Sequence, residues 1–364
     1  MLISSGVWEH CIALVSRNLP EKNFSMRMMK AAVLRDFQKG IQIEEIPVPI
    51  PKPNQVLVRI LASGLCQTDL HAVRGTWEKK PLLPLIPGHE GAGVVESVGS
   101  KVSGILPGQK VLIPWVGRTC HACHSCESGF ENLCEKQMNT GYVLPGTHAE
   151  YTVADYRHLV LFPEEMDPVQ AAPLACAGLT AYQAIQTVAN ARKESVLITG
   201  VGGVGHLAVQ YAKNVFSKVY ALDTSEAHIK MAADLGAESY GINQWRDKEV
   251  RSLVDAAIVC VGNSQALQET FRAVRNGGTL VVLGLGKESL LSLPWFETVT
   301  RAVKVIGSYV GPRDSLRKVI QIHHNEKIKV NTQVMRLDEI TDALDILAAG
   351  KNQSARMVLV PSGS

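Results

Sequence analysis

Four cysteines that lie within fifteen residues of one another are the clearest chemical signal in this chain. They are Cys120, Cys123, Cys126 and Cys134. Four thiolates so spaced can close a tetrahedral Zn²⁺ site with Zn–S bonds of about 2.3 Å, and a closed site has no open position for a substrate. We therefore predict a structural zinc, with an iron–sulfur cluster or four free, oxidation-prone thiols as the alternatives. His121 and His124, which lie between the cysteines, are interpreted as loop residues.

A glycine-rich turn marks a second candidate site. Its glycines are Gly200, Gly202, Gly203 and Gly205. The turn follows the apolar run 195–199 and begins a helix-like stretch that extends to Lys213. This context fits dinucleotide binding, because a tight turn lets the backbone approach pyrophosphate and the N–H groups of a helix N-terminus favour the anion. A purely structural turn is the alternative.

Asp223 ends the next predicted strand, 18 residues after Gly205. This is near the spacing at which a carboxylate meets the adenosine ribose of a bound dinucleotide. An acid there would repel a 2′-phosphate, and Thr224 and Ser225 supply no arginine to receive one. The sequence therefore predicts NAD rather than NADP as the cofactor.

The pattern of predicted secondary structure differs between two parts of the sequence. From residue 30 to about 160, short β-like runs alternate with Gly and Pro, which predicts a small, partly open β-barrel. From Pro168 a helix-like stretch runs through Ala189, and buried apolar strands then alternate with helices, which predicts a parallel α/β sheet. For a chain of 364 residues, the ratio of surface to volume favours two domains over one large core.

Composition and charge exclude several classes of protein. Hydrophobic residues make up 46% and charged residues 20% of the chain, as in a globular enzyme. The net charge of +3 comes without a basic run, so we expect no nucleic-acid partner. No apolar stretch reaches the roughly 18 residues of a spanning helix, so we expect a soluble chain without a membrane partner. The chain has eight cysteines, and their crowding indicates metal in a cytoplasmic enzyme rather than disulfides.

Residues 1–29 are interpreted as an N-terminal extension or as sequence upstream of the start, because Met29 begins a run typical of a fresh N-terminus. Their short apolar patch is interrupted by Glu9 and His10, unlike the apolar stretch of a secretory signal. A mitochondrial presequence is the alternative to a cytoplasmic location, but Glu9 and Glu21 count against it.

Three further segments indicate a function only when they are considered together. They are 64–71, 88–93 and 176–180, and they contain Cys66, His89 and Cys176. Spacing alone does not join these residues, each of which could be an ordinary core side chain. In this order, with the cysteine cluster and the glycine turn in place, the segments resemble the hallmark segments of the zinc-containing medium-chain alcohol dehydrogenases. The likeness runs from Met29 to the C-terminus and is greatest for the tetrameric, microbial, ethanol-type members.

The resemblance implies an α/β protein that combines a GroES-like, partly open β-barrel with a Rossmann domain, a doubly wound parallel sheet. Residues 30–178 and 314–364 would form the catalytic domain with both zinc sites, and residues 179–313 the NAD-binding domain. The active site would lie in the cleft between them. Because the chain lacks the longer insertion that dimeric members carry near the cysteine cluster, we expect a homotetramer.

The resemblance also implies a catalytic zinc on Cys66, His89 and Cys176, which makes two zinc ions per chain. Three protein ligands leave a fourth position open, and the metal would lower the pKa of an alcohol bound there. The resulting alkoxide would pass a hydride to nicotinamide in a reversible, NAD-dependent oxidation of a primary alcohol to its aldehyde. Thr68 and His71 match positions that relay the proton outward, although His71 could instead be a solvated loop residue.

Two carboxylates and two further residues match positions around these ligands. Asp69 would orient His89, and Glu90 would lie behind the metal, unless both are ordinary surface acids. Thr180 and Arg356 match positions that contact the cofactor, the arginine at its pyrophosphate.

Trp77 and Trp115, with Leu285 nearby, match positions that line a narrow alcohol pocket and favour ethanol-like substrates. Core packing of the tryptophans is the alternative for these residues, and oxidation of aromatic or longer alcohols is the alternative activity. Gln67 and His228 replace basic residues that many relatives carry beside the pyrophosphate and the adenosine ribose, so we expect weaker NADH binding. A catalytically silent zinc- or nucleotide-binding homologue is the alternative from another class of protein.

Overall fold

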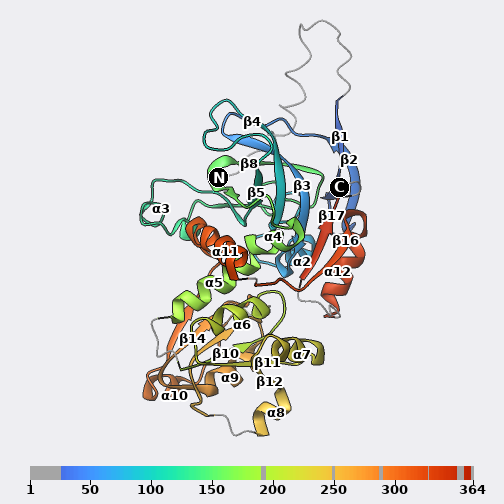
Figure 1. Ribbon diagram of the computed structural model, residues 1–364. Helices are drawn as coiled ribbons and strands as arrows, with labels where there is room; N and C mark the ends of the chain where they lie inside the picture. Colours follow the sequence, from blue (N-terminus) through green and yellow to red (C-terminus); the bar gives the residue numbers. More distant parts are fainter. Residues whose placement is uncertain are drawn as a thin grey trace, which may run out of the picture.

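The computed structural model describes residues 26–189, 194–247, 251–286, 290–326, 328–350 and 356–361. Figure 1 shows two bodies, a β-rich one at the top and an α/β one at the bottom, with α5 (Ala177–Val188) running between them. The predicted N-terminal extension lies almost entirely outside the described residues, so its role and the cytoplasmic location stay predictions. None of the helices in the described part of the chain is long and apolar enough to cross a membrane.

The upper body is built on a seven-stranded sheet. Its strands follow the order β16-β17-β3-β4-β5-β9, and β8 pairs with β3. They are β3 (Gln55–Leu65), β4 (Gly91–Val98), β5 (Lys110–Ile113), β8 (Tyr151–Asp155), β9 (Val160–Leu161), β16 (Thr332–Arg336) and β17 (Arg356–Val360). Neighbours are antiparallel except for the parallel pair β16 and β17. β-branched side chains such as Val58, Ile60 and Val111 pack together inside this barrel.

Short elements complete the upper body. Two antiparallel pairs are β1 (Met28–Leu34) with β2 (Ile41–Pro47), and β6 (Val116–Arg118) with β7 (Met138–Asn139). The helices are α2 (Gln67–Arg74), α3 (His124–Glu127), α4 (Pro168–Ala171), α11 (Arg313–Glu326) and α12 (Ile340–Ala348), and the 3₁₀ turns are η1 (Glu131–Leu133), η2 (Tyr156–His158), η3 (Ala172–Ala175) and η4 (Leu337–Glu339).

The lower body is a six-stranded parallel sheet with helices. Its strands follow the order β12-β11-β10-β13-β14-β15. They are β10 (Ser195–Thr199), β11 (Lys218–Asp223), β12 (Glu238–Gly241), β13 (Val254–Val259), β14 (Val274–Val282) and β15 (Lys304–Gly307). The helices are α6 (Gly205–Lys213), α7 (Glu226–Asp234), α8 (Ile242–Asp247), α9 (Ser264–Ala273) and α10 (Trp295–Thr300). Every residue of β10 and β13 is buried, which explains why apolar side chains dominate both strands; the buried polar residues are Ser195, Thr199 and Asp255. Strand order reverses between β10 and β13, and ligands of such sheets bind at the carboxyl ends beside that point.

The two bodies share one hydrophobic core. Ala62 and Leu112 of the barrel belong to the same cluster of buried side chains as Val196 and Ile198 of the parallel sheet. α5 contributes to this cluster and packs against both α6 and α11. A continuous core fixes the position of one body relative to the other, and with it any site between them.

The stretch from Pro168 through Ala189, predicted as helix-like, is interrupted in the structure. α4 gives way to η3, and Cys176 leaves helical geometry, with φ −131° and ψ −66°, before α5 begins. Pro173 has no backbone N–H and its ring crowds the preceding turn, which disfavours a continuous α-helix. The interruption makes Cys176 the N-cap residue of α5.

The predicted fold class, a partly open barrel combined with a doubly wound parallel sheet, is confirmed. The exact domain boundaries at residues 178 and 314 stay a prediction.

Candidate active site and metal centres

The four clustered cysteines form a compact group of sulfurs. The Sγ atoms of Cys120 and Cys134 lie 3.6 Å apart, those of Cys123 and Cys126 3.6 Å, and those of Cys120 and Cys126 3.9 Å. A tetrahedron with Zn–S bonds of about 2.3 Å has S–S edges of about 3.8 Å. The spacing therefore fits one four-sulfur metal centre, and it is too long for disulfides.

A second group joins residues that are far apart in the sequence. Ligand atoms of Cys66, His89, Glu90 and Cys176 all lie within 4.8 Å of one another. Cys66 follows β3 and caps α2, His89 and Glu90 directly precede β4, and Cys176 caps α5. The structure thus brings together the three predicted ligands of the catalytic zinc.

The chemistry of this second group fits a divalent cation. His89 is 1% exposed, and its Nε2 atom has no hydrogen-bond partner among the described residues, although an orphaned buried nitrogen is costly. Cys66 and Cys176 share a hydrogen bond, which lowers the pKa of Cys66 and raises that of Cys176. The partial positive charge at a helix N-terminus favours thiolates there, and a bound cation would favour both of them together.

Asp69 is the most connected carboxylate at this site. One oxygen accepts the backbone N–H of Gly88 at 3.1 Å and lies 3.2 Å from His89 Nδ1. The other accepts the backbone N–H of Cys66 at 2.8 Å. Burial alone would raise the pKa of Asp69, but the charge of His89 and a hydrogen bond from His148 outweigh it and hold the pKa well below its ordinary value. The carboxylate contacts both ligand-bearing segments, which fits the predicted role of Asp69 in orienting His89, and that role stays a prediction.

His148 is a buried member of the site that sequence reasoning missed. Its Nε2 atom lies 3.6 Å from Asp69, and its Nδ1 atom lies 2.8 Å from the hydroxyl oxygen of Ser63. Ser63 is in turn 2.6 Å from the Thr147 hydroxyl. No spacing signal connects His148 to the metal ligands in the sequence, because the link arises where segment 146–148 hydrogen-bonds to segment 86–88 in the fold.

Glu90 and Arg356 form a buried ion pair behind the ligand group. Arg356 Nη2 lies 3.2 Å from Glu90 Oε1, and Nη1 donates to the carbonyl oxygen of Leu65 at 3.0 Å. Gly64 makes room for the carboxylate, because a Cβ at residue 64 would lie 2.0 Å from Glu90 Oε2. The structure therefore places Arg356 at the metal site. Its predicted contact with the cofactor pyrophosphate stays a prediction, and its Nε atom is buried without a hydrogen-bond partner among the described residues.

The predicted proton relay lies on α2. Thr68 and His71 are three residues apart, which places them on one face of the helix. His71 Nδ1 lies 2.7 Å from the Thr76 hydroxyl, and the imidazole stacks on Trp77 with ring centroids 5.1 Å apart. The contacts hold the His71 ring in one orientation at the end of the helix.

Aromatic side chains surround the metal ligands. The Trp115 ring meets the His89 ring edge-on at 5.0 Å, and its indole N–H donates to the Tyr309 hydroxyl at 2.5 Å. Tyr142 contacts Trp115 and Trp77, with ring centroids 5.9 and 5.4 Å apart. The structure brings both predicted tryptophans to the site, and Tyr142 and Tyr309 are additions that no sequence motif marked.

Leu285 stands apart from this aromatic group. It is 61% exposed and lies in the loop after β14, where the backbone passes Gly262. The predicted role of Leu285 in the pocket therefore stays a prediction.

The glycine turn has the geometry that a phosphate cradle needs. Gly200 has a φ of +86°, and a Cβ on Gly205 would lie 1.9 Å from the Gly200 carbonyl oxygen, so both glycines are required by the fold itself. At Gly202 a Cβ would meet only one atom within 4 Å, a carbon of His228 at 3.9 Å. Open space at this glycine fits the close approach of a ligand to the backbone.

Asp223 lies at the carboxyl end of β11 beside the turn. It accepts the backbone N–H groups of Val201 at 2.6 Å and Ser225 at 2.9 Å, and it lies 3.4 Å from His228 Nδ1. Burial would raise its pKa, but His228 and the backbone donors outweigh burial and lower it. Asp223 is therefore a carboxylate in position to accept ribose hydroxyls, and His228 is its neighbour.

Thr180 lies one turn into α5, where its N–H donates to the Cys176 carbonyl at 2.8 Å. The predicted cofactor contact of Thr180 would thus arise on the same helix that carries a metal ligand. Sequence spacing alone does not reveal this link, since it depends on where α5 begins.

Known proteins resemble this chain over most of its length. The model of the alcohol dehydrogenase GroES-like domain matches residues 52–164, and that of the zinc-binding dehydrogenase domain matches residues 203–325. An alcohol dehydrogenase of Geobacillus stearothermophilus is 40% identical over 329 residues, covering 89% of this chain and 96% of that protein. One of Moraxella sp. is 36% identical over 330 residues, covering 89% and 97%. The crystal structure of the alcohol dehydrogenase from Aeropyrum pernix matches with a TM-score of 0.84 and 33% identity, covering 91% of this chain and all of that one.

A barrel with two clusters of metal ligands, joined to a parallel sheet with a phosphate-binding type of turn, defines a metal-dependent dehydrogenase. The similar proteins reported above identify the family within this class. The chain belongs to the zinc-containing medium-chain alcohol dehydrogenase family, and it is an oxidoreductase. The family predicted from the sequence is confirmed.

Proposed function

We propose that this enzyme catalyses the reversible, NAD-dependent oxidation of a small primary alcohol to its aldehyde. The observation that carries the proposal is the buried group of Cys66, His89 and Cys176, in which the His89 Nε2 atom has no hydrogen-bond partner in the part of the chain that the structure describes. Zinc bound by these residues would act as a Lewis acid on the alcohol oxygen and leave a coordination position open to substrate.

The protein side chains have separate tasks in this proposal. Asp69 lies 3.2 Å from His89 Nδ1, and a proton held on Nδ1 by this carboxylate would leave Nε2 to bind the metal. Trp115 covers one side of that ring and helps to exclude water. Thr68 and His71 carry the alcohol proton toward solvent along α2.

The choice of NAD rests on Asp223. The carboxylate faces the glycine turn, where it accepts three backbone N–H groups, and its negative charge would repel a phosphate at the ribose 2′ position. His228 is the nearest basic side chain on α7 and is paired with Asp223. The pair supports NAD over NADP and weaker dinucleotide binding than a lysine would give.

Small substrates are supported by the packing of Trp115, which is 7% exposed and tied to both His89 and Tyr309. A rigid indole next to the metal ligand limits the room for a bulky alcohol. Longer or aromatic alcohols are the second candidate, because Leu285, which was expected to help narrow the pocket, is 61% exposed. A solved structural relative is a cinnamyl alcohol dehydrogenase from Sorghum bicolor.

A combined metal and substrate assay tests this function. Elemental analysis of the purified enzyme should find two zinc ions per chain, and one in a His89→Ala variant. The kcat/KM for ethanol should exceed that for benzyl alcohol, and NAD should be preferred to NADP. A preference for NADP would contradict the role of Asp223, and one zinc per chain without turnover would support the silent homologue instead.

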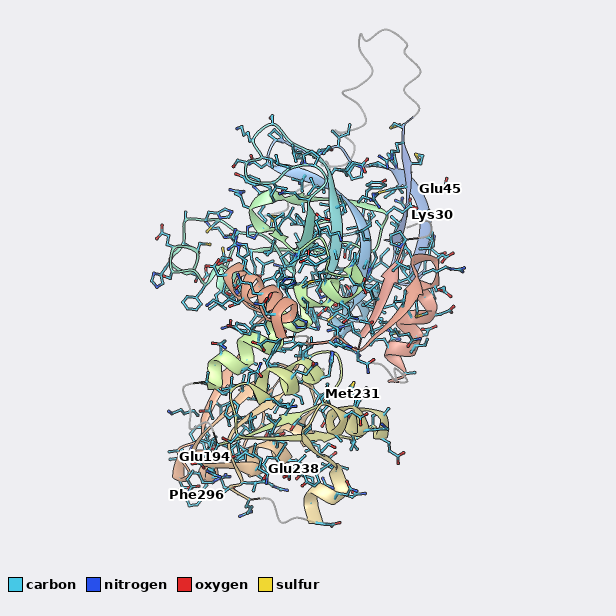
Figure 2. All side chains as sticks on the ribbon, viewed as in Figure 1. Lys30, Glu45, Glu194, Met231, Glu238 and Phe296 are labelled. Atoms are coloured by element: carbon cyan, nitrogen blue, oxygen red, sulfur yellow. The ribbon has the colours of Figure 1, made fainter. Side chains whose placement is uncertain are left out.

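We also propose that the enzyme is a homo-oligomer, with the tetramer as the expected form. β15 is an edge strand of the parallel sheet, and α10 before it exposes large apolar side chains. Trp295 is 86%, Phe296 77% and Val299 67% exposed, and Figure 2 shows Phe296 at the lower end of the molecule. Apolar side chains gathered beside an open edge support association with a second copy. Sedimentation analysis of a Trp295→Asp variant should show a smaller species than the parent enzyme.

A further inference from the structure

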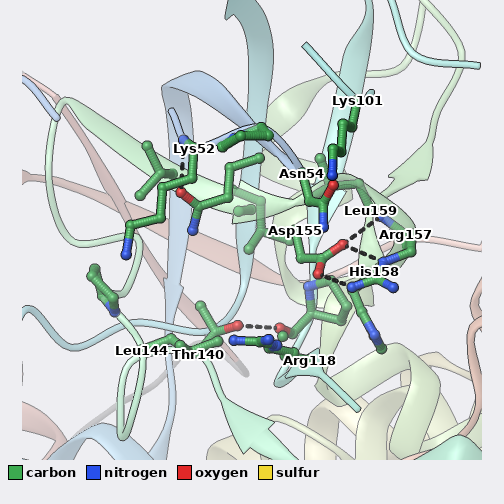
Figure 3. A pocket seen from close by; sticks show the side chains of 18 residues that line it. Lys52, Asn54, Lys101, Arg118, Thr140, Leu144, Asp155, Arg157, His158 and Leu159 are labelled. Atoms are coloured by element: carbon green, nitrogen blue, oxygen red, sulfur yellow. Dashed lines mark hydrogen bonds and ion pairs between the residues drawn. The ribbon is translucent and has the colours of Figure 1, made fainter. Parts of the chain in front are cut away.

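We propose that a basic cavity on the barrel, outside the active site, binds a small phosphate-bearing anion. The cavity has a volume of about 330 Å³, within the range of small-molecule sites. Segments around Lys52, Arg118, Thr140 and Asp155 line it, and Figure 3 shows these side chains around the cavity. None of the metal ligands or cofactor residues described above is among its lining residues.

The charges around the cavity do not balance. Of four cationic side chains, Arg157 is neutralised by Asp155, with Nη2 and Oδ2 2.6 Å apart (Figure 3). The other three are Lys52, Lys101 and Arg118. In the part of the chain that the structure describes, none of their side chains has an ion pair. Three uncompensated cations around one concave surface produce a local positive potential that attracts anions.

A buried donor distinguishes this cavity from an ordinary cluster of solvated surface charges. His158 lines the cavity and is 1% exposed. Its Nε2 atom lies 3.4 Å from the Thr119 hydroxyl, whereas its Nδ1 atom is buried and has no hydrogen-bond partner among the described residues. Burial, with the nearby charge of Arg313, lowers the pKa of His158 to about 4, so the ring is neutral near pH 7.

The neutral ring leaves one tautomer that suits an anion. When the Thr119 hydroxyl donates to Nε2, the proton of His158 resides on Nδ1, which becomes a donor without an acceptor. A buried N–H without an acceptor is unfavourable, and a ligand oxygen would satisfy it. The lining of the cavity thus offers one buried donor and three exposed cations.

This set of donors matches a tetrahedral oxyanion. A phosphate group has several oxygens that can accept from guanidinium, ammonium and imidazole donors in different directions. The amide side chains of Asn54 and Gln55 also line the cavity and could hold the remaining part of a phosphorylated molecule. The phosphate could come from inorganic phosphate or from a phosphorylated metabolite, and the experiment separates the two.

Calorimetric titration of the zinc-loaded enzyme tests the proposal, with NADH present in excess so that the cofactor site is filled. The probes are inorganic phosphate, pyrophosphate and glycerol 3-phosphate. A Lys101→Gln/Arg118→Gln variant should bind the preferred probe about tenfold more weakly, because two charged contacts are lost. His158→Phe should weaken binding as well. Tighter binding of glycerol 3-phosphate than of inorganic phosphate would indicate a phosphorylated metabolite, and the reverse order would indicate free phosphate.

A matched control removes the same charge elsewhere. Lys39 and Lys318 are exposed and lie outside the cavity, so a Lys39→Gln/Lys318→Gln variant should change binding less than about twofold. Equal weakening by this control would mean general attraction to a basic protein and would overturn the proposal. Absence of binding of all three probes at millimolar concentration would also overturn it. Lys101 and Arg118 are exposed, so their replacement leaves the fold intact even where His158→Phe does not.

Discussion

Replacing Asp69 with Asn tests whether the carboxylate prepares the catalytic metal site. Asp69 is 1% exposed and receives the N–H groups of Cys66 and Gly88 besides its contacts with His89 and His148. An asparagine has one acceptor oxygen, and its amide nitrogen would face N–H groups that also donate. At least one donor next to the metal would therefore lose its acceptor.

The magnitude follows from these contacts. A hydrogen bond to a charged group contributes about 1.5–3 kcal/mol, and the loss of a carboxylate that orients a metal-bound histidine weakens metal binding about 10- to 100-fold. The two values agree, because a tenfold change corresponds to about 1.4 kcal/mol. We expect Asp69→Asn to bind its catalytic zinc about 10- to 100-fold more weakly than the parent enzyme.

A chelator titration followed by elemental analysis measures this effect. The cysteine cluster serves as an internal control, because none of its four sulfurs contacts Asp69. The chelator concentration that removes zinc from this cluster should therefore be the same in the variant as in the parent enzyme. Asp314→Asn is the matched variant, since the Asp314 side chain is 80% exposed. If the Asp69→Asn enzyme kept both zinc ions as firmly as the parent, the assignment of Asp69 as the support of His89 would be refuted.

Further changes probe other parts of the site. Gly202→Ala should leave the thermal unfolding midpoint unchanged but raise the Kd for NADH about tenfold or more, because the added methyl meets almost no protein atom and fills the space for the ligand; a displaced midpoint would show a role in the fold instead. Replacing His71 with Ala should lower kcat near neutral pH with partial rescue by added imidazole, and an unchanged pH profile would remove it from the relay. Gln67→Arg should tighten NADH binding, measured by fluorescence titration, and unchanged affinity would count against the explanation given for the missing basic residue. Burial opposes ionisation of Glu131, but its contacts with Arg313 lower its pKa, so its stabilising effect is present above the ordinary carboxyl range and is lost as the pH falls through the lowered value. Glu131→Gln should therefore reduce the free energy of unfolding at pH 7 more than at pH 4, and denaturant titrations that gave equal losses at both would contradict this.

Features whose partners are near in sequence were predictable. The four clustered cysteines need only one loop to meet, and the glycine turn needs only the strand before it and the helix after it. Local spacing was sufficient for both, because a short segment has few ways to arrange its side chains. The alternation of strands and helices likewise predicted the parallel sheet.

The catalytic group was a different case. Cys66 follows β3, His89 lies just before β4 and Cys176 follows η3, and only their resemblance to family segments joined them in the sequence. The break at Cys176 was not part of the prediction for this stretch, although Pro173 is a local signal against a continuous helix.

The sequence by itself predicted the protein family, which the relatives confirm, and it predicted a cysteine metal centre and a dinucleotide turn, whose geometry in the structure fits those roles. Only the tertiary structure showed that His148 lies beside Asp69, that Arg356 forms an ion pair with Glu90, and that Trp115 donates a hydrogen bond to Tyr309. The physical reason is the same in each case. These contacts depend on the pairing of strands and bodies that are distant along the chain, and such pairings are selected by the packing of the whole core rather than by any local spacing.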